Sequence, residues 1–77
     1  MTLSRPQQPM PDDIAALLDE RGLRTAYDAR PPYQRNDYLG WIARAKRPVT
    51  REKRIAQMQS ELAAGNVYMK MAWHSGR

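Results

Sequence analysis

The residues best suited to chemistry form a dense group of cations between positions 44 and 54. Six basic side chains lie there beside a single carboxylate, that of Glu52. A group of this kind attracts anions and speeds their encounter with the protein, without selecting one of them. The cations are Arg44, Lys46, Arg47, Arg51, Lys53 and Arg54. The chemistry that they offer is therefore the binding of phosphate or carboxylate groups.

A helix start is expected inside this group. Pro48 ends the preceding element, and Thr50 is placed to cap a new helix by accepting a hydrogen bond from a backbone amide of the first turn. The unpaired amides and the partial positive charge of a helix start also hold anions. We therefore predict a binding site for an anion or a protein partner, called the basic corner below. Its residues are Lys46, Arg47, Thr50, Arg51, Lys53 and Arg54.

Two other interpretations of the basic corner stay open. In the first, it is only a capped helix start with solvated or paired cations, and the expected pairs are Arg51 or Arg54 with Asp37 or Glu61. In the second, two helices joined by a tight turn resemble a helix-turn-helix and bind nucleic acid. Such binding would be non-specific, because the outward side of the following helix offers few side chains that read bases. They are Gln57, Gln59 and Ser60.

Residues for catalysis or metal binding are scarce. The single histidine, His74, lies near the C-terminus, and the chain has no cysteine. Of the two acidic pairs, Asp12-Asp13 complements the dipole of a helix start and Asp19-Glu20 reads as a solvated face, and neither has companion metal ligands. We therefore expect no enzymatic activity, no metal site and no cofactor.

The spacing of apolar residues predicts the elements that position these side chains. Three main helices are expected at residues 11–21, 32–46 and 50–64, with a short helical turn at 23–29. Gly22 is expected in the left-handed conformation just past the first helix. The predicted fold class is all-α: a small bundle of three main helices with one short extra turn and irregular termini.

The core is expected where the helices on either side of Pro48 face each other. Tyr38, Trp41 and Ile42 repeat at helical spacing, with Trp41 as the central residue. Their expected partners on the following helix are Ile55, Met58 and Leu62. An aromatic binding platform at Tyr38 and Trp41 is the alternative, but so small a chain needs their area for its core.

One domain, residues 11–66, is expected between a flexible N-terminal tail at 1–10 and a C-terminal tail at 67–77 that packs partly on the bundle. Residues 67–73 alternate with the period of a strand, but no second strand is evident. The methionines at 69 and 71 offer an adaptable apolar surface or fill gaps in the core. We expect a monomer or a weak homodimer.

The distribution of charge and apolar residues limits the class of protein. The 77 residues carry a net charge of +5, with five basic and six acidic residues up to position 43 and eight basic and two acidic residues after it. No basic segment followed by an apolar run opens the chain, and no apolar stretch approaches the roughly 20 residues that span a bilayer. We therefore expect a cytoplasmic location.

The segment from Tyr38 to Ile55 resembles the signature of the bacteriocin-protection, YdeI or OmpD-associated family. The matching residues are Tyr38, Trp41, Ile42, Ala45, Lys46, Pro48, Thr50, Arg51, Arg54 and Ile55. The resemblance implies a helical module that serves bacterial stress and envelope resistance and has no settled enzymatic activity. Gly40 departs from the family pattern, in which a polar or charged residue is usual, and these 77 residues include no upstream β-rich domain of the kind that many relatives carry.

The sequence and the resemblance together predict a non-enzymatic helical interaction module. It would bind a protein or another anionic partner through the basic corner, with nucleic acid as the alternative ligand.

Overall fold

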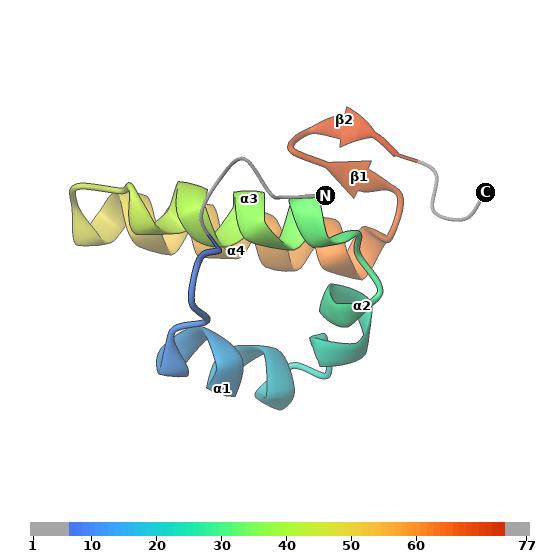
Figure 1. Ribbon diagram of the computed structural model, residues 1–77, viewed down its shortest axis with the longest axis horizontal. Helices are drawn as coiled ribbons and strands as arrows, with labels where there is room; N and C mark the ends of the chain where they lie inside the picture. Colours follow the sequence, from blue (N-terminus) through green and yellow to red (C-terminus); the bar gives the residue numbers. More distant parts are fainter. Residues whose placement is uncertain (1–6, 74–77) are drawn as a thin grey trace.

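A computed structural model describes residues 7–73 of the chain (Figure 1). Its elements are the helices α1 (Asp12–Glu20), α2 (Arg24–Asp28), α3 (Pro32–Ala43) and α4 (Pro48–Ala64), and the strands β1 (Val67–Tyr68) and β2 (Met71–Ala72). The predicted helices are confirmed in number and order. The all-α prediction is wrong at the C-terminal end, where a small two-stranded sheet forms. The predictions made for residues 1–6 and for His74 lie outside the described residues.

The helix ends follow proline and glycine. Gly22, just past α1, has φ +69°, as predicted for a left-handed residue after a helix. Helix α3 ends at Ala43, three residues earlier than predicted, and α4 already begins at Pro48. The prediction that Thr50 caps α4 is wrong, because Arg47 occupies the N-cap position. Proline suits the first helical position, since its fixed φ is helical and its missing N–H would be unpaired there in any case.

The helices form two pairs rather than a single bundle of three. Helices α3 and α4 lie side by side and run in nearly opposite directions, as their short connector at residues 44–47 dictates (Figure 1). Helix α1 packs on α2, and α2 also contacts α4. The hairpin of β1 and β2 lies against the C-terminal end of α4. The connector and the first turns of α4, which carry the basic corner, therefore lie at the end of the α3–α4 pair far from the hairpin.

The core lies between these pairs. The predicted packing of α3 against α4 is confirmed for the buried residues Tyr38, Ile42, Ile55, Met58 and Leu62. Ile14 and Leu18 of α1, Tyr27 of α2 and Leu39 of α3 complete it. Gln34, which is also buried, keeps its amide paired because it accepts a hydrogen bond from Arg30. The apolar residues of all four helices thus share one core.

The prediction that Trp41 is the central residue is wrong. Tyr38 is fully buried, whereas Trp41 is half-buried and packs against the core from its edge. A tyrosine can occupy the centre because its hydroxyl finds a partner, here the carboxylate of Glu61. The guanidinium of Arg54 lies over the Trp41 ring, 5.2 Å from its centroid.

The prediction of an irregular, unpaired C-terminal segment is wrong for residues 67–72. Val67 pairs with Ala72 and Tyr68 with Met71 in an antiparallel hairpin. The two turn residues, Met69 and Lys70, have φ of 49° and 64°, the left-handed conformation that such two-residue turns require. Asn-Gly or Asp-Gly is the usual pair there, so Met-Lys carried no hairpin signal. The second strand of the hairpin is therefore the C-terminal part of the alternating segment at residues 67–73.

The N-terminal residues that the structure describes lie against the helices. The amide of Gln8 donates a hydrogen bond of 2.6 Å to Oδ1 of Asn36 on α3. Met10 is half-buried and packs against the core. Residues 7–10, assigned by sequence to a tail, thus make specific contacts with the domain.

Candidate functional site

The side chains of the basic corner have different environments. The basic corner lies on the connector between α3 and α4 and on the first two turns of α4. Lys46, Arg47 and Lys53 are exposed. Thr50, Arg51 and Arg54 are only half-exposed. The two arginines of this second group have structural partners.

Arg51 connects α4 to α1. Its Nη1 donates to Oδ2 of Asp13 at 2.8 Å and its Nη2 donates to Oδ1 at 3.2 Å, which is the two-pronged geometry that guanidinium and carboxylate favour. The hydrogen bond from Arg51 lowers the pKa of Asp13, and the same bond raises the pKa of Arg51. The predicted pairs with Asp37 or Glu61 are wrong for this residue, because α1, not the hairpin end, packs beside this turn of α4.

Arg54 is bound to the end of α3. Its Nη1 donates a hydrogen bond of 2.6 Å to the carbonyl oxygen of Trp41, and its guanidinium lies over the Trp41 ring. A cation near the last carbonyl groups of a helix satisfies unpaired acceptors and complements the helix dipole. Arg54 therefore holds α3 and α4 together at this end, and the predicted carboxylate partners do not apply to it.

The partial positive charge at the N-terminus of α4 is not compensated by its own first turn. No side chain caps it, and its first turn holds no acidic residue. The exposed cations Lys46, Arg47 and Lys53 surround it, and Arg44 on the connector is exposed as well. Unpaired amides and unpaired cations at one helix start form a surface suited to a carboxylate or a phosphate.

The helix-turn-helix interpretation concerns the arrangement of α3 and α4. These two helices lie side by side and run in opposite directions, joined by the connector at residues 44–47 (Figure 1). Of the candidate base-reading side chains, Gln57 already donates a hydrogen bond of 3.0 Å to Oε2 of Glu61. Gln59 is half-buried and Ser60 is exposed. Of these three side chains, only Ser60 is exposed, and nucleic-acid binding stays a prediction.

Glu61 was expected from the sequence only as an ion-pair partner for Arg51 or Arg54, and sequence reasoning missed the role that its carboxylate has in the structure. It is buried, and it accepts hydrogen bonds from the Tyr38 hydroxyl and the Gln57 amide. It also accepts from the backbone amides of both turn residues of the hairpin, Met69 at 2.7 Å and Lys70 at 2.8 Å. Glu61 therefore fixes the hairpin onto α4. The spacing of Gln57 and Glu61 on one helical face was the single local signal, and it does not point to the turn.

A second buried group closes the C-terminal end of α4. Arg30 donates from Nη2 to the carbonyl oxygen of Glu61 at 2.9 Å and from Nη1 to Oε1 of Gln34 at 3.0 Å. The ring of Trp73 lies over its guanidinium, 4.5 Å from the centroid. Tyr68 stacks edge-on against Tyr38 and Tyr33 nearby. This end of the fold is therefore built from polar groups that satisfy one another.

The bonds to Glu61 predict a loss of stability in acid. Burial acts to raise the pKa of Glu61, but the hydrogen bonds from Tyr38, Lys70, Met69 and Gln57 outweigh it and lower the pKa below 4.5. A lowered folded-state pKa stabilises the protein fully above the unfolded value, and this contribution is lost as the pH falls through the folded value. Urea unfolding followed by circular dichroism should therefore show a midpoint that decreases below about pH 4.5.

Two variants show which carboxylate is responsible for the loss of stability in acid. Glu61→Gln should remove most of this acid dependence, because it removes the group that titrates. Asp13→Asn should remove little of it, because the Asp13 side chain is 60% exposed and its ion pair is screened. An acid dependence that is unchanged in Glu61→Gln would assign it to another group.

Within residues 7–73, no three or more histidine, cysteine, aspartate or glutamate side chains gather closely enough to hold a metal ion. No helix in the described part of the chain is both long and apolar enough to cross a membrane.

Comparison with known proteins finds a family whose model matches the chain. The family model described as Bacteriocin-protection, YdeI or OmpD-Associated matches residues 8–65. The match begins at Gln8, whose amide is bound to α3, includes all four helices and the whole basic corner, and ends at Gly65, before the hairpin. Neither a curated protein nor a solved structure matches the chain. A match over this much of the sequence means that the chain belongs to the bacteriocin-protection, YdeI or OmpD-associated family.

Proposed function

We propose that this protein is a non-enzymatic interaction module that binds an acidic segment of a partner protein through Lys46, Arg47 and Lys53. The family description suggests a role associated with bacterial resistance. The proposal includes a cytoplasmic location and a monomeric or weakly dimeric state. It narrows the predicted site to those cations of the basic corner that have no partner among the described residues.

The observation that carries the proposal is the start of α4. Helices usually place acidic residues in the first turn and a capping side chain before it, and both compensate the positive end of the helix dipole. Helix α4 has Arg47 at the N-cap position, no side-chain cap and no acid in its first turn. The connector adds the charges of Arg44 and Lys46. Without a ligand, these positive charges repel one another and the positive end of the helix. A carboxylate that binds there reduces this repulsion.

Titration with a labelled hexaglutamate peptide tests this proposal. Fluorescence anisotropy at low and moderate salt should give saturable binding that Arg47→Glu weakens by about fivefold to tenfold, since the substitution reverses one charge at the centre of the site. The matched control is Arg21→Glu, which makes the same charge change at an exposed residue after α1. Equal weakening by both variants, or no binding at low salt, would contradict the proposal.

Two further choices sharpen this experiment. Arg51 should be left intact, because Arg51→Glu would break the bond to Asp13 and change the packing of α1 together with the surface charge. A duplex DNA of mixed sequence serves as a competitor. If DNA displaces the peptide at both salt concentrations and its affinity falls steeply as salt rises, the result would favour nucleic acid over an acidic protein segment as the ligand.

A further inference from the structure

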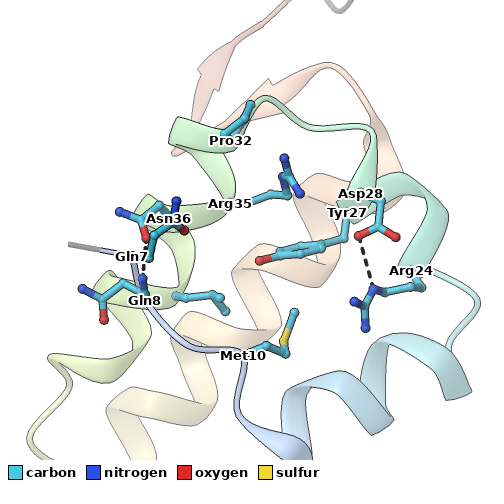
Figure 2. Close-up of a pocket in the computed structure, with 10 residues that line it drawn as sticks. Gln7, Gln8, Met10, Arg24, Tyr27, Asp28, Pro32, Arg35 and Asn36 are labelled. Carbon is cyan, nitrogen blue, oxygen red and sulfur yellow. Dashed lines mark hydrogen bonds and ion pairs between the residues drawn. The ribbon is translucent and has the colours of Figure 1, made fainter. Parts of the chain in front are cut away.

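A pocket of about 420 Å³ lies between the N-terminal segment, α2 and the first half of α3 (Figure 2). This volume lies within the range of small-molecule sites, about 300–1,000 Å³. None of its lining residues belongs to the basic corner. The pocket is therefore a separate feature that the proposed function does not use.

The two sides of the pocket are held by polar contacts. On one side the amide of Gln8 is bound to Asn36, and on the other Nε of Arg24 donates to Oδ1 of Asp28 at 3.2 Å. Arg35 and Tyr27 lie between these two pairs (Figure 2). Apolar walls come from Tyr27 and from two residues packed in the core, Met10 and Leu39. The pocket thus combines fixed walls, an apolar lining and one central cation.

The charge of the pocket is not balanced. Asp28 neutralises Arg24, with which it forms an ion pair. The side chain of Arg35 forms no ion pair and no hydrogen bond within the part of the chain that the structure describes. Its Nε is enclosed and has no acceptor. A guanidinium N–H that has lost its water and has no acceptor is unfavourable, so the group that this pocket lacks is an anion.

We propose that this pocket binds a small organic anion with an apolar body, of the aromatic carboxylate class, and that Arg35 binds the carboxylate. Guanidinium and carboxylate match in a planar, two-pronged geometry, so one ligand group can satisfy Nε and a terminal nitrogen together. Because Nε is enclosed in the empty pocket, the guanidinium turns when the ligand enters. The ring of the ligand then lies against Tyr27, Met10 and Leu39.

Benzoate is the probe, titrated into the full chain and followed by the amide NMR spectrum. We expect saturable shifts around Tyr27 and Leu39, and a loss of affinity of about tenfold in Arg35→Gln, which removes one charge-assisted contact. Arg35→Lys keeps the charge without the planar fork and should bind more weakly than wild type. The matched control is Arg21→Gln, an exposed arginine just after α1 that belongs neither to the pocket lining nor to the basic corner, and this variant should bind benzoate as the wild type does.

Four results would overturn the proposal. The first is that Arg35→Gln binds benzoate as tightly as the wild type does. The second applies if Arg35→Gln does not fold, and it is that Arg35→Lys binds benzoate as tightly as the wild type does. The third is binding of the neutral benzamide as tight as that of benzoate, which would remove the role of charge. The fourth is equally tight binding of inorganic phosphate, which would remove the role of the apolar lining. Hexaglutamate binding at the basic corner should be unaffected by Arg35→Gln, so this proposal and the proposed function fail independently.

Discussion

Replacing Glu61 by alanine should lower the free energy of unfolding by about 3–5 kcal/mol, because one substitution leaves the buried hydroxyl of Tyr38 and several partly buried donors without an acceptor. The amides of Met69 and Lys70 and the hydroxyl of Tyr38 all lose their partner, and Gln57 loses its own. Each buried unsatisfied group costs about 1–3 kcal/mol, less where water can enter. Urea unfolding followed by circular dichroism measures the change.

The hairpin should respond before the helices do. Its turn residues hold a left-handed conformation that only the carboxylate of Glu61 compensates with hydrogen bonds. In Glu61→Gln one amide oxygen remains as an acceptor, so a smaller loss of about 1–2 kcal/mol is expected. Hydrogen exchange at Met69 and Lys70 should accelerate in both variants. A Glu61→Ala protein within about 1 kcal/mol of wild type would mean that water replaces the carboxylate.

Truncating Tyr38 to alanine should cost about 3–5 kcal/mol, whereas the same truncation of Trp41 should cost at least about 1 kcal/mol less. The sequence predicts the opposite order, since tryptophan is larger and lies on the same helical stripe. Tyr38 is 0% exposed and its removal leaves an enclosed cavity in the centre of the core. Trp41 lies at the edge, so water and the side chain of Arg54 can fill the space that it leaves.

Thermal and urea unfolding of Tyr38→Ala and Trp41→Ala show which of the two substitutions costs more stability. Tyr38→Phe is the control, because it keeps the ring and removes only the hydroxyl bound to Glu61, at an expected cost of about 1–2 kcal/mol. A larger loss in Trp41→Ala than in Tyr38→Ala would restore Trp41 as the centre of the core. Trp41→Ala should in addition remove the surface on which the guanidinium of Arg54 lies.

The helices could be predicted because their signals are local. Apolar spacing, the proline at position 48 and the glycine at position 22 lie within a few residues of the feature that they indicate. The hairpin could not be predicted in this way, because its turn lacks the usual residues and depends on a carboxylate of α4 eight or nine positions earlier. The sequence also did not predict that Tyr38 is more deeply buried than Trp41, because the partner of the Tyr38 hydroxyl is 23 residues away.

By itself, the amino-acid sequence determined the family, the four helical segments and the buried stripes of α3 and α4, since each depends on residue type and short-range spacing. The tertiary structure decided which cations have partners. Arg51 is bound to Asp13, 38 residues away, and Arg54 to the carbonyl of Trp41, 13 residues away, while Lys46, Arg47 and Lys53 remain exposed. Charge alone cannot make this distinction, because an arginine that joins two helices and an arginine that awaits a ligand differ only in what the fold places beside them.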